Sequence, residues 1–347
     1  MINTLLIRLK IWSQAFRYHF VPPSIFPATI GGLVSWAVNQ TFSVWYFFLV
    51  LLGVTINHIA LNMTDDYFDF AHAVDQLKPG EKNPYTGGSG TLTSGLIMPE
   101  AMFKAFTLLY CIVAIIGVYL GIRRGPLILV LGSFGILCSI FYTAPPIKFS
   151  HRGLGELGLL INFGPVIGLG SYVVQAQQVS IAALWATLPC GIMLFSMIII
   201  NEIPDLAEDK RAGKLTLIAR YGTQAGVKLY LVSWAATYLV ILVGALIGVL
   251  PPLTLIALLS LPLAYRSVKV LVTHYNDPQR MAPANLDMLR AHGLTSLLLI
   301  GAYALAGAVR GADGMQLLGV LLLLAAFYIP AALPVVRPVR KKEQARS

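Results

Sequence analysis

The sequence predicts an all-α integral membrane protein, folded as a single bundle of nine or ten transmembrane helices. Hydrophobic residues make up 57% of its 347 residues and charged residues 12%. The mean hydropathy of +0.74 lies far from the usage of soluble domains. Nearly uncharged runs such as 181–200, 229–250 and 315–336 match the roughly 20 residues that a helix needs to cross a bilayer.

The hydrophobic runs divide the chain into ten expected helices. Turn-forming pairs such as Gly125-Pro126 and Pro251-Pro252 join neighbouring runs into tight hairpins, while the longer connections hold most of the polar residues. We expect one domain over 1–347, in which a tenth helix at 315–336 precedes a basic tail at 337–347. The expected helices cover 22–41, 43–64, 102–122, 126–144, 156–176, 180–202, 226–249, 252–272, 292–309 and 315–336.

The distribution of positive charge predicts the orientation of the bundle. Of the 25 Lys and Arg residues, all except Arg123, Arg124 and Arg310 fall near alternate helix ends that share one face. The positive-inside rule predicts that this face is cytoplasmic. We expect the membrane to be the cell membrane of a bacterium or archaeon. The net charge of +10 therefore follows mainly from topology, and nothing in the chain resembles a nucleic-acid-binding module.

Two rows of acids, each headed by an asparagine, stand at the cytoplasmic ends of the second and sixth expected helices. The first acidic row is Asn62, Asp66 and Asp69, and the second acidic row is Asn201, Asp205 and Asp209. Spacings of four and seven or eight residues put these oxygens on one helical face, where close carboxylates repel unless cations hold them. The pattern predicts a divalent-metal site between two helix ends.

Basic residues follow both rows, which indicates a polyanionic ligand bridged by metal. The first row precedes Asp75, Lys78 and Lys82, and the second precedes Lys210 and Lys214. Mg²⁺ is usually held by one or two carboxylates together with substrate phosphates, so a diphosphate between the rows would meet its needs. Sites at helix ends beside long loops also favour an interfacial enzyme over a transporter, whose ionisable groups commonly lie near the bilayer midplane.

The ordered motifs resemble the UbiA superfamily of intramembrane aromatic prenyltransferases. Arg17 lies ten residues before Pro27, the segment 142–148 reads Tyr-Thr-Ala-Pro-Pro-Ile-Lys, and 153–156 reads Gly-Leu-Gly-Glu, as in that family. The segment 201–222, with Gly-Lys-x-Thr-Leu and a closing Arg-Tyr-Gly, is similar to its second signature. Within the superfamily, the string 66–69 with Asp75 beyond it looks most like the 1,4-dihydroxy-2-naphthoate prenyltransferases of menaquinone synthesis.

The resemblance implies Mg²⁺-dependent alkylation of an electron-rich ring by a polyprenyl diphosphate, and it assigns roles to individual residues. The diphosphate would leave, and the ring would capture the allylic cation; Tyr142 would present its π face to that cation. The catalytic set is Asp66, Asp69, Asp205, Asp209 and Tyr142. The implied metal ligands are Asn62, Asp66, Asp69, Asp205 and Asp209. The implied substrate-binding residues are Arg17, Asn62, Asn201, Lys148, Arg152, Lys210 and Lys214.

Several features depart from the family pattern or have ordinary explanations. Lys78 to Tyr85 form an inserted basic stretch, Pro204 interrupts the second row, and nine helices are typical of the superfamily. Acids at helix ends are often solvated, and Gly164 with Gly168 has the spacing of close helix packing. The acceptor stays open among naphthoate, hydroxybenzoate, homogentisate, a porphyrin and a glycerol-phosphate lipid. A secondary transporter, a CDP-alcohol phosphotransferase and a non-catalytic quinone-binding protein are the rival classes.

Overall fold

The computed structural model describes residues 2–74, 88–310 and 314–332. Helices make up most of this part of the chain, and no strand occurs within it. The sequence-based hypotheses about Asp75, Lys78, Lys82 and the tail at 337–347 lie outside the described residues. The helices are α1 (Ile2–Phe16), η1 (Tyr18–Phe20), α2 (Pro22–Asn39), α3 (Val44–Ala71), α4 (Pro99–Arg124), α5 (Leu127–Phe141), η2 (Phe149–Arg152), α6 (Gly155–Ile161), η3 (Asn162–Val166), α7 (Ile167–Ala176), α8 (Ile181–Arg211), α9 (Leu217–Tyr221), α10 (Thr223–Leu246), η4 (Pro252–Ser260), α11 (Leu261–His274), α12 (Ala282–Val309) and α13 (Gly314–Ala332).

Each of the ten expected hydrophobic segments is helical over most of its described residues, which confirms the prediction of an integral membrane bundle. Seven helical segments of the described chain are long and apolar enough to cross a bilayer, and the bent pair Leu6–Phe20 with Pro22–Asn39 raises the number to eight. The helices Leu127–Phe141 and Leu318–Ile329 are apolar but shorter. A tilted or partly inserted helix of that length still buries its apolar side chains against neighbours or lipid.

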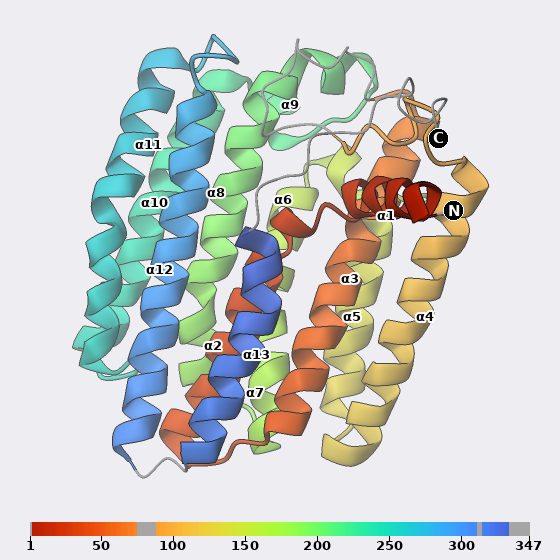
Figure 1. Ribbon diagram of the computed structural model, residues 1–347. Helices are drawn as coiled ribbons and strands as arrows, with labels where there is room; N and C mark the ends of the chain where they lie inside the picture. Colours follow the sequence, from red (N-terminus) through yellow and green to blue (C-terminus); the bar gives the residue numbers. More distant parts are fainter. Residues whose placement is uncertain (1, 75–87, 311–313, 333–347) are drawn as a thin grey trace.

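The long helices stand side by side, and α1 lies across one end of the bundle, at the same end as α9 (Figure 1). The bend between α1 and α2 is 52°. Figure 1 also shows α4 and α5 at one flank of the bundle and α11 at the other, while α2 lies within it. We call the end that carries α1 and α9 the α1 end of the bundle.

The helix α2 forms the centre of the packing and contacts α7, α8 and α12. Its residues are hydrophobic all round, as expected for a helix without a solvent-facing side, and Ile30, Leu33 and Trp36 are almost fully buried. Ser171 of α7 donates a hydrogen bond of 2.6 Å to the backbone carbonyl of Ala28. The helix α2 is therefore held on several sides, and its Pro23 lines the site described below.

The predicted ends of two helices were wrong, because α3 continues to Ala71 rather than 64 and α8 to Arg211 rather than 202. Polar residues continue a helix as readily as apolar ones once its hydrogen-bonded ladder is established. The helix α8 also runs through Pro204, whose lack of a backbone N–H removes one bond of the ladder without ending it. Both acidic rows thus lie within helices.

Gly164 and Gly191 bring η3 and α8 into close contact. The spacing of Gly164 and Gly168 predicts such close helix packing. A Cβ added at Gly164 would lie 2.8 Å from the backbone of Gly191 and 2.9 Å from the carbonyl oxygen of Thr187. The segment from Asn162 to Val166 is a π turn that contains Pro165. A π turn accommodates the missing donor of proline and leaves the flanking helices α6 and α7 in one continuous path.

We predict that Gly164→Leu destabilises the protein by about 1–3 kcal/mol or more, because backbone atoms of α8 occupy the space that the new side chain needs. Thermal unfolding of the detergent-solubilised protein would measure the change. Gly301→Leu is the matched control, since a Cβ at Gly301 meets nothing within 4 Å. Equal unfolding temperatures of the two variants would contradict the packing described here.

Candidate active site

A cavity of about 180 Å³ opens at the α1 end of the bundle, and α3 and α8 supply its polar wall. We call it the first cavity. Both acidic rows contribute to it, through Asn62 and Asp69 on one side and Asn201, Asp205 and Asp209 on the other. The structure therefore brings together two segments that lie well over a hundred residues apart in the chain.

The deeper wall of the first cavity is apolar. Leu194 and Met197 of α8 face Leu159 and Phe163 of α6 and η3 across it. At 1.5 Å per residue, the helix rises about 16 Å between Leu194 and Asp205. The cavity thus joins a charged mouth to an apolar interior along the direction of the bundle.

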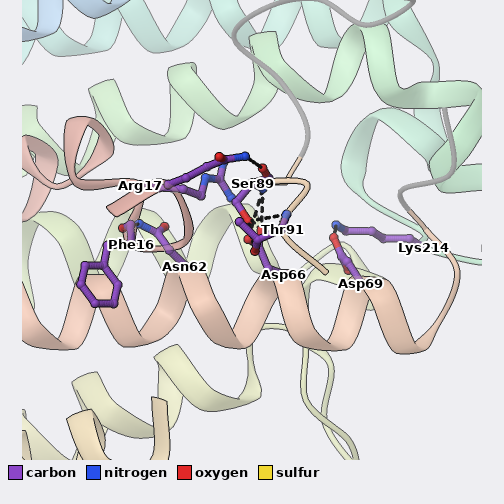
Figure 2. Close-up of polar contacts among 9 residues, drawn as sticks. Phe16, Arg17, Asn62, Asp66, Asp69, Ser89, Thr91 and Lys214 are labelled. Carbon is purple, nitrogen blue, oxygen red and sulfur yellow. Dashed lines mark hydrogen bonds and ion pairs between the residues drawn. The ribbon is translucent and has the colours of Figure 1, made fainter. Parts of the chain in front are cut away.

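The first acidic row is held by contacts from both sides (Figure 2). Arg17 Nη1 lies 3.3 Å from Asp66 Oδ1, and the backbone N–H of Ser89 donates to both carboxylate oxygens of Asp66 at 3.1 and 3.2 Å. The amide nitrogen of Asn62 donates to the carbonyl of Phe16 at 3.2 Å, so α1 is tied directly to α3. These contacts turn Asp66 toward Arg17 and Ser89, and it does not line the first cavity.

Lys214 reaches the first row from the turn that follows α8. Its ammonium lies 2.9 Å from Asp69 Oδ2, and its backbone N–H donates to the carbonyl of Asp209 at 2.8 Å. Burial disfavours the ammonium charge, but Asp69, Asp65 and Asp209 outweigh that cost and hold the pKa of Lys214 well above its usual range. Lys214 is therefore a fixed positive charge between the two rows.

The second acidic row lies on α8 opposite α3. Asp209 is 4% exposed, and Asn285 of α12 donates a hydrogen bond of 2.8 Å to the side-chain oxygen of Asn201. Glu202 and Glu208, neighbours of the row, also line the first cavity. The helix α8 thus contributes two carboxylates to the cavity, those of Glu202 and Glu208, in addition to the predicted Asp205 and Asp209.

The donor set fits a divalent cation, although the protein alone does not supply a closed cage. Among residues 2–74, 88–310 and 314–332, no three His, Cys, Asp or Glu side chains converge tightly enough to hold a metal. Asp65 Oδ1, Asp69 Oδ1 and Glu202 Oε2 are buried carboxylate oxygens without a hydrogen-bond partner. Such atoms are costly unless a ligand completes them, and hard oxygen donors suit Mg²⁺.

Tyr142 lines the first cavity from the end of α5. Ser150 fixes its backbone, since both the N–H and the hydroxyl of Ser150 donate to the Tyr142 carbonyl, at 2.9 and 2.8 Å. Burial raises the pKa of the Tyr142 hydroxyl well above its ordinary value. The side chain consequently stays neutral and offers its ring to the cavity.

Three of the predicted substrate-binding residues do not line the first cavity. The ammonium of Lys148 lies 2.8 Å from His72 Nε2, at the end of α3. Arg152 donates to the carbonyl of Pro146 at 3.0 Å, and Lys210 is exposed. Arg17 and Lys214, by contrast, line it.

Sequence reasoning missed several residues that complete the site. Ser89, Glu202 and Asn285 hold or extend the two rows, yet only Glu202 lies beside a row in sequence. Glu156, which the resemblance singled out, accepts a hydrogen bond of 2.6 Å from the backbone N–H of Leu217 and so holds α9 against the start of α6. Adjacency to Asn201 was the one available signal for Glu202.

Comparison with known proteins gives consistent results. A sequence profile of the UbiA prenyltransferase family matches residues 24–290. The chain is 24% identical over 298 residues to 2-carboxy-1,4-naphthoquinone phytyltransferase of Synechocystis, covering 86% of this chain and 94% of that protein. It is 27% identical over 305 residues to 1,4-dihydroxy-2-naphthoate octaprenyltransferase of Mycobacterium tuberculosis, covering 86% and 96%.

A solved structure shares the fold. A UbiA homologue from Archaeoglobus fulgidus, bound to GPP and Mg²⁺, superposes with a TM-score of 0.65 at 14% identity, over 86% of this chain and 99% of that one. The family profile covers most of the chain, and naphthoate prenyltransferases are among its relatives. The protein is accordingly a membrane prenyltransferase that belongs to the UbiA prenyltransferase family.

Proposed function

We propose that the protein transfers a polyprenyl group from a polyprenyl diphosphate to 1,4-dihydroxy-2-naphthoate in a Mg²⁺-dependent reaction. One observation carries the proposal: a single cavity joins two acidic helix faces and two basic side chains to an apolar interior. The names of the naphthoate prenyltransferases among the relatives support the acceptor. The GPP and Mg²⁺ in the structural relative support the donor and the ion.

The charged mouth of the first cavity suits the diphosphate of the donor, and the apolar interior suits its chain. Arg17 and Lys214 enter from opposite sides and can neutralise phosphate oxygens through charge-assisted hydrogen bonds. Leu194, Met197 and Phe163 exclude water from the interior, where the first isoprenoid units would lie. The carbon–oxygen bond to be broken would then stand at the boundary between the two regions.

Five residues are proposed to hold Mg²⁺: Asn62, Asp66, Asp69, Asp205 and Asp209. A bound Mg²⁺ would supply Lewis-acid stabilisation of the departing diphosphate. The amide nitrogen of Asn62 donates a hydrogen bond to the carbonyl of Phe16, so the amide oxygen of Asn62 is the atom that would bind a cation. Because Arg17 and Lys214 contact Asp66 and Asp69, the acids remain paired before any ligand binds.

Tyr142 is proposed to stabilise the allylic cation through its ring, since its hydroxyl stays protonated and neutral. Asn201 is proposed to support the donor from α8, where Asn285 holds its side chain. Lys148, Arg152 and Lys210 are proposed to attract the anionic substrates toward the mouth rather than to bind them inside. We further propose that the α1 end faces the cytoplasm and that the whole chain forms one domain.

We predict that Asp66→Asn and Asp205→Asn each lower prenyl transfer by about a hundredfold or more, because each removes a negative charge that the diphosphate-bound cation needs. Product formation by purified protein, followed by mass spectrometry at saturating Mg²⁺, would measure the loss. Glu100→Gln is the matched control, since Glu100 is an exposed acid at the start of α4. Full turnover in both site variants would refute the assignment of the two rows.

We expect Lys214→Met to raise the KM for the polyprenyl diphosphate by about tenfold, because a charge-assisted contact to phosphate is lost. Lys214→Arg should restore part of the affinity, since the positive charge remains. Lys104→Met removes an exposed lysine of α4 and should change nothing. An unchanged KM in Lys214→Met would remove Lys214 from the donor site.

The acceptor is tested directly by incubating the purified protein with Mg²⁺, mixed polyprenyl diphosphates and a panel of aromatic acceptors. We expect a prenylated product from 1,4-dihydroxy-2-naphthoate and none from 4-hydroxybenzoate or homogentisate, with EDTA abolishing the reaction. Mass spectrometry of the products identifies both the acceptor and the chain length. Prenylation of another acceptor alone would replace the naphthoate assignment while leaving the transferase chemistry in place.

A further inference from the structure

A second cavity of about 210 Å³ lies between α3, α4, α5 and α7 and shares no lining residue with the first cavity. Glycines open its wall. A Cβ added at Gly117 of α4 or Gly132 of α5 would meet nothing within 4 Å. The wall is otherwise formed mostly by aliphatic side chains such as Val54 and Leu120. The space therefore suits a slender apolar chain.

One end of the second cavity carries two polar side chains with incomplete hydrogen bonding. Asn57 donates its amide nitrogen to the hydroxyl of Ser139 at 2.8 Å, and Ser139 donates in turn to the carbonyl of Gly135 at 2.9 Å. The amide oxygens of Asn57 and Asn162 are buried and have no partner. A buried acceptor left unpaired costs about 1–3 kcal/mol, so each oxygen would gain from a ligand that donates a hydrogen bond.

Both asparagines line the second cavity, and local structure leaves space beside the buried oxygen of Asn162. Asn162 is 1% exposed and begins the π turn that precedes α7. Its side-chain oxygen lies 3.4 Å from the position of a Cβ at Gly135, so the missing side chain of that glycine leaves room beside it. π turns occur frequently at functional sites. The first cavity is lined by Phe163 of this turn and Leu159 of α6, but its described lining contains neither asparagine.

The depth of the asparagines narrows the class of ligand. At 1.5 Å per residue, Asn57 lies about 20 Å along α3 from its start at Val44. The hydrocarbon core of a bilayer is about 30 Å thick, so this polar end lies within it. Among the described residues, no Lys, Arg, Asp or Glu lines the second cavity. A charged headgroup at such depth would be costly, which leaves an uncharged lipid whose polar group donates hydrogen bonds.

We propose that the second cavity binds a prenylated hydroquinone. Its ring hydroxyls donate to the side-chain oxygens of Asn57 and Asn162, and its isoprenoid chain lies along the wall formed by Gly117 and Gly132. The choice of a hydroquinone rests on the proposed function: substitution at the ring carbon that bears the carboxylate, with diphosphate leaving the donor and the carboxylate leaving as CO₂, would attach such a chain to an uncharged aromatic diol. The cavity would hold this lipid apart from the reacting groups.

The test uses the full-length protein in phospholipid nanodiscs and a prenylated hydroquinone whose chain carries a diazirine. After irradiation, mass spectrometry locates the labelled peptides. We expect labelling of α3, α4, α5 and α7 that is about tenfold weaker with the dimethyl ether of the same probe, which cannot donate hydrogen bonds. Equal labelling by the two probes would overturn the proposal and indicate a groove filled by any apolar chain.

Two substitutions locate the ligand, and each has a control. Gly132→Leu places a side chain in the cavity, at a position where its Cβ meets nothing within 4 Å, and should lower this labelling about tenfold, with Gly117→Leu as a second filling variant. Asn57→Leu should reduce the difference between hydroquinone and ether, because it removes one of the two acceptors. Gly301→Leu, whose Cβ also meets nothing within 4 Å but which lies outside the lining of the cavity, should label as the wild type does. Undiminished labelling in both filling variants would contradict the site.

Prenyl transfer measured on the same samples separates this inference from the proposed function. Stronger labelling by the hydroquinone probe than by its ether, without prenylation of 1,4-dihydroxy-2-naphthoate, would support the second cavity and refute the acceptor assignment. Prenylation of 1,4-dihydroxy-2-naphthoate with equal labelling by the two probes would support the acceptor assignment and refute the second cavity. Displacement of the label by a polyprenyl diphosphate alone would place the probe in the first cavity and overturn the inference.

Discussion

Mutual repulsion among buried carboxylates is the constraint around which this end of the bundle is organised. Both acidic rows contribute side chains to one cavity, although Asp66 turns away from it, and several of their carboxylates are almost fully buried. Such a concentration of negative charge is stable only when cations accompany it. The protein supplies two of them, Lys214 at 2.9 Å from Asp69 and Arg17 at 3.3 Å from Asp66.

The same constraint explains why irregular segments cluster at the α1 end. Arg17 adopts a left-handed backbone conformation, with a φ of 48°, between α1 and η1. Lys214 follows Gly213, whose φ of 70° ends α8 and turns the chain back toward α3. Glu156 then holds α9 through the N–H of Leu217. The two acidic rows thus lie on the regular helices α3 and α8, whereas Arg17 and Lys214 lie in the turns between helices.

Much of the architecture follows from the sequence, because hydrophobic length and charge distribution report directly on membrane helices. The two acidic rows were also predictable, since a helical period relates their members within a single segment. Ser89 and Asn285 were not, because their contacts with Asp66 and Asn201 join segments whose proximity depends on the packing of the entire bundle. The ends of α3 and α8 were placed too early, because hydropathy marks where a helix leaves the apolar region and not where its hydrogen bonds cease.

Specific pairing likewise separates residues that look equivalent in sequence. Lys148 and Lys214 are both lysines beside family motifs, yet Lys148 contacts His72 and Lys214 contacts Asp69. Counting charges does not distinguish them, since both lie on the face that the sequence predicts to be cytoplasmic. Only the turn geometry distinguishes a base at the rim of the site from one within it.

The position of α1 gives the bilayer surface a structural role. This helix lies across the bundle (Figure 1), and Leu6 and Leu9 on it are each 58% exposed. Its last residue accepts the hydrogen bond from Asn62, and the next residue, Arg17, pairs with Asp66. A displacement of α1 relative to the bundle would therefore change the contacts of Asn62 and Asp66 at the same time.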